Sequence, residues 1–287
     1  MPIDSFICPD GVTIKTEDCL SKCRMSQRCI SKATLRTISR GNAKRKWDGV
    51  PHVTQLLNGT MLSYLEVMNG YPTDPMDSAY TLLGSNHHAL LESGLEPEEG
   101  LTEYSINNGW IQGTVDSIER TPEGWLITDY KTFGSYRVAK LLGIVRVKGL
   151  KRGSKPMFTQ SPSSVDNIHE ALQLNMYRLL VKEELGHSAK LRLQVTVRDG
   201  GLQVAASRGI DKPMYLVDVP TLPDDYVRDY FKSKAEALVQ AVKGEITPAM
   251  CTSEEHWEFK RCARYCSVAH LCNVGKAVKL GIREGIQ

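Results

Sequence analysis

The sequence lacks the features that would connect it to a membrane or to secretion. It contains no apolar run approaching the roughly 20 residues that a membrane-spanning helix needs. Its N-terminus shows no charged segment followed by an apolar stretch and a small-residue cleavage site. We therefore expect a cytoplasmic protein with no membrane partner.

The sequence also has little excess charge and no evident linker. The net charge is only +3, so the overall charge says little about partners. Hydrophobic residues make up 41% of the chain and charged residues 24%, which is ordinary for a soluble globular protein. No stretch rich in proline and serine marks a domain boundary. We place boundaries by the cysteines instead, which predicts segments at residues 1–50, 51–245 and 246–287.

All eight cysteines fall into two blocks with one shared spacing, C-x10-C-x3-C-x5-C. The N-terminal block is Cys8, Cys19, Cys23 and Cys29, and the C-terminal block is Cys251, Cys262, Cys266 and Cys272. In a reducing cytosol such tetrads bind thiolate-preferring metals, as zinc or an iron–sulfur cluster. A disulfide framework, the less favoured alternative, suits short secreted chains better. The spacing leaves open whether each block binds its own metal or the two blocks exchange ligands.

The hydrophobic pattern predicts helices and strands in an order that gives an α/β fold with a mixed sheet. We expect helices over residues 53–68, 79–95, 166–185 and 224–242. We expect strands over residues 111–118, 125–130, 190–197, 201–206 and 214–219. Residues 143–165 are rich in glycine, proline, serine and lysine, which predicts a loop.

Two carboxylates and a lysine lie on the strands of a predicted hairpin. Asp116 ends the stretch Gly-Thr-Val-Asp on the first strand, and Asp129-Tyr130-Lys131 ends the second. Residues i and i+2 of a strand share a face, so Asp129 and Lys131 should project side by side. Two close carboxylates favour a hard divalent cation such as Mg²⁺ or Mn²⁺, and the lysine would orient an attacking water. A surface hairpin with an Asp–Lys pair is the simpler alternative.

Further polar residues on two predicted helices complete the pattern. His88 lies on the helix before the hairpin, and imidazole is a usual ligand of a catalytic metal. Gln173 and Tyr177 stand four residues apart on a later helix, so they share one face. Each of these features alone is more often structural, but their order along the chain is harder to attribute to chance.

In this order the residues resemble the motifs of the RecB-like branch of the PD-(D/E)XK nuclease superfamily. The C-terminal triplet Cys262, Cys266 and Cys272 is similar to that of the cysteine-cluster exonucleases of the AddB and CRISPR-adaptation type. The resemblance implies a restriction-endonuclease-like core with a central mixed sheet flanked by helices. It also implies a metal-dependent deoxyribonuclease, expected to be an exonuclease, that acts on single-stranded DNA or duplex ends.

The resemblance also implies a role for each motif residue. His88, Asp116, Asp129 and the main-chain carbonyl of Tyr130 would hold Mg²⁺ or Mn²⁺, and Lys131 would be the catalytic lysine. His88 is preferred to His87 because it lies four residues after a glycine and four before a glutamate, as in the family. Gln173 and Tyr177 would contact DNA. A separate expectation, which rests on the basic residues of the predicted loop and not on the resemblance, is that Lys148, Lys151 and Arg152 contact the phosphate backbone.

In the cysteine-cluster relatives the triplet joins one distant upstream cysteine around a 4Fe–4S cluster. This sequence departs from them, because its triplet has an x3 spacing where they have x2, and because it carries a complete second tetrad. Structural zinc therefore remains the alternative to a cluster. A non-catalytic nucleic-acid-binding module and a redox protein remain alternatives to a nuclease.

One further absence concerns partners. The sequence has no G-x-x-x-x-G-K-[ST] phosphate-binding loop. Any helicase that works with this nuclease would be a separate chain, and a recombination or CRISPR-adaptation protein is the other partner we expect.

Overall fold

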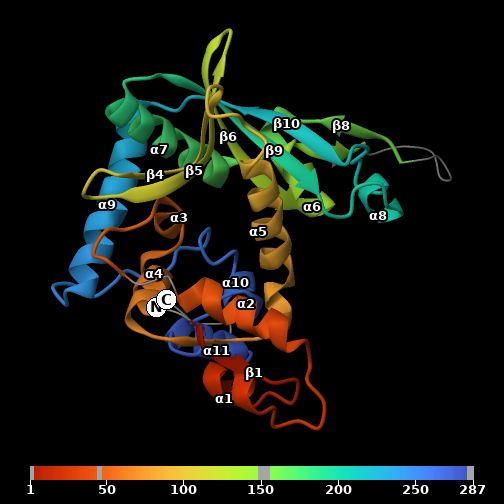
Figure 1. Cartoon of the computed structure of the whole chain (residues 1–287), viewed down its shortest axis with the longest axis vertical. Coiled ribbons are helices and arrows are strands. Elements are labelled where there is room, and N and C mark those ends of the chain that lie inside the picture. The colour runs from red at the N-terminus through yellow and green to blue at the C-terminus, as the bar shows by residue number, and fades with distance from the viewer. Residues whose placement is uncertain (1–2, 44–46, 148–155, 283–287) are drawn as a thin grey trace. The chain divides into compact units, whose positions relative to one another are not determined.

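The computed structural model describes residues 3–43, 47–147 and 156–282 (Figure 1). It divides into two compact units. The cysteine unit comprises Met1–Leu82, Gly109–Ile111 and Tyr230–Gln287, and the sheet unit comprises Leu83–Asn108 and Gln112–Asp229. The basic residues Lys148, Lys151 and Arg152 lie outside the described residues. The three-part division at residues 50 and 245 stays a prediction.

The sheet unit is built on five strands in the order β10-β9-β6-β5-β4. These are β4 (Gly100–Asn107), β5 (Gln112–Thr121), β6 (Gly124–Phe133), β9 (Ala189–Val197) and β10 (Met214–Val219). Strands β6 and β9 are parallel, and the other neighbours are antiparallel. The α/β fold with a mixed sheet flanked by helices, which the sequence predicts, is therefore confirmed.

Alternating burial of side chains explains how the strands pack against the core. In β9 the odd-numbered residues from Ala189 to Val197 are buried, and the residues between them are more exposed. This period of two puts one apolar face of the strand against the core. Strand β6 is buried over four successive residues, Leu126 to Asp129, as expected of a central strand.

Helix α7 (Ile168–Leu185) lies on the chain between the parallel strands β6 and β9. It is buried all round from Glu170 to Val181, and it ends at Gly186, whose φ of 72° gives the left-handed cap that favours glycine. The remaining elements of this unit are short, apart from the helices that cross its boundaries. They are α6 (Ser135–Leu141), β7 (Ile144–Arg146), β8 (Phe158–Gln160), η2 (Pro162–Ser164) and α8 (Gln203–Ala206).

The buried polar groups of α7 are paired. Glu170 accepts two hydrogen bonds of 2.6 Å from Arg137 on α6. Arg178 is 4% exposed, and it donates to Asp224 at 2.7 Å, at the start of α9 (Asp224–Val242). Because an unpaired buried polar group costs about 1–3 kcal/mol, these partners are needed to keep the helix in the core.

The cysteine unit contains a three-stranded sheet in the order β2-β1-β3. Its N-terminal core is formed by Ile3, Phe6, Cys19, Leu35 and Ile38. The strands are β1 (Ile3–Ile7), β2 (Thr13–Lys15) and β3 (Tyr71–Thr73). The helices are α1 (Thr16–Ser21), α2 (Lys32–Ala43), α3 (Val53–Leu56), α4 (Thr60–Met68), η1 (Pro75–Ser78), α10 (Lys260–Arg264) and α11 (Asn273–Lys279). Helix α5 (Ala79–Glu92) begins in this unit and continues in the sheet unit.

Some of the predicted elements are wrong in detail. The strand predicted at 201–206 is the short helix α8, which follows a turn at Gly201 with a φ of 81°. The helix predicted at 53–68 is interrupted before Gly59, which caps α4. The loop predicted at 143–165 contains the paired strands β7 and β8. No helix among the described residues has the length and apolar character needed to cross a membrane.

Candidate metal and active site

Adjacent strands bring the predicted carboxylates together. Strands β5 and β6 pair antiparallel from Ser117↔Thr128 outward, so Asp116 and Asp129 follow at the next position of the ladder. Asp116 Oδ2 accepts a 2.7 Å hydrogen bond from the backbone N–H of Tyr130. The Asp116 side chain is 12% exposed and Asp129 is 2% exposed, so both charges lie largely out of water.

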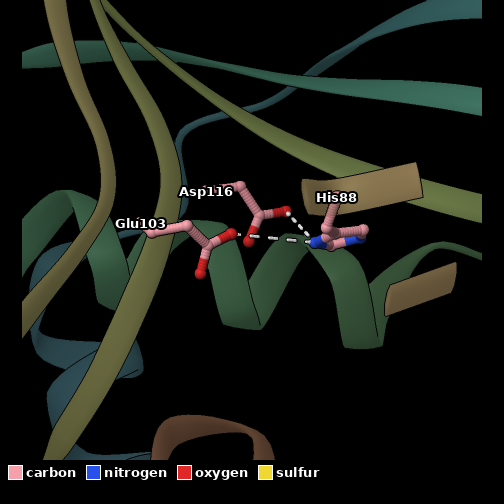
Figure 2. Close-up of side chains that lie close together, drawn as sticks. All are labelled: His88, Glu103 and Asp116. Carbon is pink, nitrogen blue, oxygen red and sulfur yellow. Dashed lines mark ion pairs between the residues drawn. The ribbon is translucent and has the colours of Figure 1, made fainter. Parts of the chain in front are cut away.

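Three ligand-type side chains converge at this point. His88 on α5, Glu103 on β4 and Asp116 on β5 point toward one another, and their ligand atoms all lie within 4.8 Å (Figure 2). His88 Nδ1 is 3.6 Å from Asp116 Oδ2 and 4.0 Å from Glu103 Oε1. Among the described residues no other group of three histidine, cysteine or acidic side chains is so close. One nitrogen and several carboxylate oxygens suit a divalent metal ion.

Glu103 is the site residue that sequence reasoning missed. It lies opposite Asp116, between the pairs Thr102↔Ser117 and Tyr104↔Val115 of the β4–β5 ladder. Its φ of 46° is left-handed, which is costly for a residue with a side chain and rare within a strand. No recognisable motif surrounds it, and the strand that carries it was not predicted. Such local strain is concentrated at functional sites in proteins.

Asp129 makes a different set of contacts from the other two predicted ligands. Its Oδ1 accepts from Lys131 Nζ at 2.8 Å and from Gln173 Nε2 at 3.0 Å. Its Oδ2 is buried and lies 2.6 Å from Lys131 Nζ, but it receives no hydrogen bond of good geometry. Asp129 is therefore paired with the lysine beside the group of three, and one of its oxygens keeps unused acceptor capacity.

The electrostatics of the site reflect crowded negative charge. Burial, followed by the neighbouring charge of Asp129, raises the pKa of Asp116 to about 6. Burial also raises the pKa of Glu103. For Lys131, burial alone would lower the pKa, but the charge and hydrogen bond of Asp129 outweigh it and the pKa is raised. The lysine thus stays protonated at neutral pH, while the carboxyl groups would gain from a bound cation.

Gln173 and Tyr177 form the wall of the site on α7. They are 8% and 3% exposed, and Gln173 Nε2 lies 3.5 Å from the Tyr177 hydroxyl as well as near Asp129. Burial, followed by the charge of Asp129, raises the pKa of Tyr177, so its hydroxyl stays neutral. Both side chains thus border the paired Asp129, and their direct contact with DNA stays a prediction.

The neighbouring histidine is directed elsewhere. His87 Nε2 lies 3.1 Å from Thr196 Oγ1 on β9, and His87 is not one of the three converging residues. The ring of Tyr130 lies edge-on to His88, with centroids 6.2 Å apart. The preference for His88 over His87 as a metal ligand stays a prediction.

Each cysteine block gathers within its own part of the chain. None of the eight cysteines forms a disulfide. The thiols of Cys251, Cys262, Cys266 and Cys272 all line one cavity of about 270 Å³. Burial raises the pKa of Cys266 to about 11, and Cys262 and Cys251 add smaller contributions. In the N-terminal block, burial raises the pKa of Cys19, Arg28 opposes this, and Cys23, Cys8 and Cys29 add to it.

Comparison with known proteins places this geometry in a family. Residues 87–273 match the family described as the PD-(D/E)XK nuclease superfamily. The chain belongs to that superfamily. The matched segment contains His88, Glu103, Asp116, Asp129 and Lys131, the residues of the candidate site.

Two solved structures are similar to the chain at low identity. The crystal structure of SSO0001 has a TM-score of 0.45 and 16% identity, over 84% of this chain and 94% of that chain. A structure from Eubacterium rectale, described as a "Putative exonuclease", has a TM-score of 0.31 and 10% identity, over 58% of this chain and 56% of that chain. None of the curated proteins matches the chain.

Proposed function

We propose that this PD-(D/E)XK superfamily member is a Mg²⁺- or Mn²⁺-dependent deoxyribonuclease that degrades DNA from single-stranded or duplex ends. The observation that carries the proposal is the convergence of His88, Glu103 and Asp116 within 4.8 Å, beside the Asp129–Lys131 pair. The group combines nitrogen and oxygen donors, and the raised pKa of Asp116 marks a place where added positive charge is favourable. These features fit a divalent ion.

In this mechanism three side chains would bind the metal ion, and Lys131 provides a positive charge next to it. His88, Glu103 and Asp116 would hold a divalent ion, which would supply Lewis acidity for activating water and polarising the scissile phosphate. Lys131, kept protonated by Asp129, adds a positive charge where negative charge develops on the phosphate. Gln173 fixes the Asp129 carboxylate at 3.0 Å, so the lysine has a fixed anchor. Asp129 Oδ2 keeps unused acceptor capacity beside this group of three.

The test compares two variants on labelled DNA. Asp116→Asn removes a ligand charge, so cleavage and Mn²⁺ binding should both be lost. Lys131→Met removes the positive charge without removing a ligand, so cleavage should fall at least 100-fold while Mn²⁺ binding persists. The assay uses single-stranded and duplex DNA with Mg²⁺ or Mn²⁺, and calorimetry measures Mn²⁺ binding. DNA binding without any cleavage by the wild-type protein would instead indicate a non-catalytic binding module.

We also propose that the cavity lined by the C-terminal cysteines holds a 4Fe–4S cluster. A tetrahedral zinc site with bonds of 2.3 Å needs sulfur atoms about 3.8 Å apart. Among the described residues no three thiol sulfurs lie within 4.8 Å of one another, and the cavity of about 270 Å³ leaves room for a larger group. Zinc remains the alternative, and it would leave the purified protein colourless.

The local gathering of each block supports one metal site per tetrad. Cys8→Ser should then reduce the metal content by the N-terminal site alone, and Cys272→Ser by the C-terminal site alone. Each loss should lower thermal stability, because thiolate ligation is coupled to folding. Metal analysis of anaerobically purified protein measures both. If one substitution emptied both sites, the ligands would be shared between the blocks.

A partner is part of the same proposal. We infer that a helicase, or a protein of recombination or CRISPR adaptation, supplies DNA ends to this nuclease as a separate chain. Membership of a nuclease superfamily implies a nucleic-acid substrate, which such a partner would deliver.

A further inference from the structure

The stretch between Cys251 and Cys272 presents an exposed aromatic and cationic surface. We name it the Trp257 surface, and it comprises Trp257, Lys260, Arg261, Arg264 and Tyr265. Trp257 is 45% exposed and Tyr265 is 68% exposed, and their ring centroids are 5.9 Å apart with the rings tilted by 59°. Because the rings are tilted, they are not stacked on each other, and both side chains are exposed to solvent.

The backbone beneath this surface is strained. Trp257, Glu258 and Phe259 have φ angles of 52°, 52° and 68°, so three successive residues with side chains are left-handed. Each such residue costs about 1–2 kcal/mol, and the conformation persists only where the surroundings impose it. Here the Phe259 N–H donates to His256 Nδ1 at 2.9 Å, and the two rings stack with centroids 4.3 Å apart. The turn thus sends Phe259 to the cysteine cavity and leaves Trp257 exposed.

An arginine supports the tryptophan on one face of its ring. The Arg261 guanidinium lies over the Trp257 ring, 5.2 Å from its centre, so a base would stack on the opposite face. The same group donates to Asn58 Oδ1 at 2.6 Å and to the Glu255 carbonyl at 3.3 Å. Arg261 is therefore held in place before any ligand binds, which lowers the entropy cost of using the ring it supports.

The cations of the surface are only weakly neutralised. Lys260 and Arg264 are exposed, and Lys260 lies 3.6 Å from the exposed carboxylate of Glu258. Within the described ranges no carboxylate comes within 4 Å of Arg264. An exposed salt bridge such as that of Lys260 is worth about 0–1 kcal/mol, so a phosphate can compete for the lysine.

This chemistry matches single-stranded nucleic acid. Unpaired bases stack on aromatic rings with about 1–3 kcal/mol per base, and lysine or arginine beside the rings contacts the phosphates. A blunt duplex, whose bases are already stacked on one another, cannot use the rings in this way. A purely apolar docking site for a protein would not need the exposed cations Lys260 and Arg264 in the same segment as the rings.

We propose that the Trp257 surface binds single-stranded DNA by stacking unpaired bases on Trp257 and Tyr265, while Lys260 and Arg264 contact the backbone. The proposal extends the nuclease function, and it rests on that function only in taking DNA as the ligand. It assigns the C-terminal cysteine segment a second role beside metal binding, as a site that holds the strand.

The test measures binding without cleavage. Labelled oligo-dT and a blunt duplex of the same length are titrated in buffer without divalent cations, with the catalytic lysine replaced (Lys131→Met) in every protein. Trp257→Ala and Tyr265→Ala should each weaken oligo-dT binding about 10-fold and change duplex binding far less. Trp257→Phe should retain most of the affinity. The matched control is Tyr226→Ala, an exposed tyrosine (49%) that lies between aspartates on α9.

The salt dependence tests the cations separately. Replacing Lys260 and Arg264 with glutamine should reduce the slope of log affinity against log salt by about 1.4, since each phosphate contact to a single strand contributes about 0.7. Thermal melting and metal content show whether each variant is folded. If Trp257→Ala loses its metal, the result for Tyr265→Ala decides, because that side chain is the more exposed.

Two results would overturn the proposal. One is unchanged oligo-dT binding in folded Tyr265→Ala and Trp257→Phe/Tyr265→Ala proteins, which would show that the rings of the surface do not hold the strand. The other is an equal loss on the blunt duplex, which would remove the preference for unpaired bases. Neither depends on catalysis, so a protein that fails to cleave DNA with Mg²⁺ would contradict the proposed nuclease and leave this measurement intact.

Discussion

Replacing Glu103 with glycine should make the metal-free protein more stable and its metal site weaker. The left-handed φ of 46° costs a residue with a side chain about 1–2 kcal/mol. Glycine removes that strain but loses about 0.5–1 kcal/mol through its greater freedom in the unfolded chain. The net expectation is a free energy of unfolding raised by about 0–1.5 kcal/mol, with a central value of about 0.75 kcal/mol. The same change removes one of the three converging ligands, so Mn²⁺ affinity should fall about 10- to 100-fold or more.

Glu103→Gln is the matched control, because it removes the charge and keeps the strained backbone. Urea unfolding of both metal-free variants, followed by circular dichroism, compares their stabilities. Titration calorimetry with Mn²⁺ compares their metal sites, since Mn²⁺ prefers oxygen ligands over the thiols of the cysteine blocks. Both variants should bind Mn²⁺ weakly, and the glycine variant should be more stable than the glutamine variant.

The reasoning fails on either of two results. If the glycine variant is less stable than the glutamine variant, the backbone at this position is not strained in solution. If Mn²⁺ binds both variants as tightly as the wild type, Glu103 is not a ligand and its closeness to His88 and Asp116 has another cause.

Three further outcomes follow from the structure. The pKa of Asp116 is raised to about 6, so between about pH 4 and 6 its carboxyl group is protonated in the folded chain and ionised in the unfolded chain. The metal-free protein should therefore become more stable as the pH falls through that range. Over the same range Mn²⁺ affinity, measured by calorimetry, should fall about tenfold per pH unit below 6. Asp224→Ala leaves its buried arginine partner on α7 without a counter-charge and should cost about 1–3 kcal/mol in urea unfolding, whereas the exposed neighbour Asp225→Ala should cost less than about 0.5 kcal/mol. Gly59→Ala would put a methyl group 2.4 Å from Cys251 Sγ, so metal analysis should find the C-terminal site depleted and the N-terminal site full.

The sequence predicted the parts of the sheet unit that follow local rules. Strands β6 and β9 carry long apolar or alternating patterns, and α7 has a clear glycine stop, so their types were predictable. Strand periodicity put Asp129 and Lys131 on one face, and the predicted hairpin put Asp116 on the adjacent strand, but these residues were preferred as a site only because of the ordered series of motifs. The closeness of His88 to Asp116 came from the family resemblance and not from any local pattern.

What the sequence did not predict depends on contacts between distant segments. Strand β1 pairs in parallel with β3, Ile3 opposite Tyr71, and no local signal marks a three-stranded sheet assembled in this way. Glu103 has a positive φ, which residues with a side chain rarely adopt. Its place beside Asp116 depends on pairing with the neighbouring strand, which the local sequence does not indicate. The bond from Gln173 to Asp129 joins residues 44 positions apart, so the spacing of Gln173 and Tyr177 indicated a shared face but not its partner.

The hydrogen bond from Gln173 to Asp129 also determines which of the neighbouring polar groups donates a hydrogen bond and which accepts one. An ionised carboxylate can only accept hydrogen bonds, so the amide of Gln173 must turn its nitrogen toward Asp129. The second hydrogen of that nitrogen faces the Tyr177 oxygen at 3.5 Å, so the tyrosine receives there. Because the pKa of Tyr177 is raised, its hydroxyl stays protonated and can donate one hydrogen bond to another group. With its hydroxyl hydrogen available, Tyr177 suits a group that only accepts hydrogen bonds, such as a phosphate oxygen, and disfavours a group that only donates them.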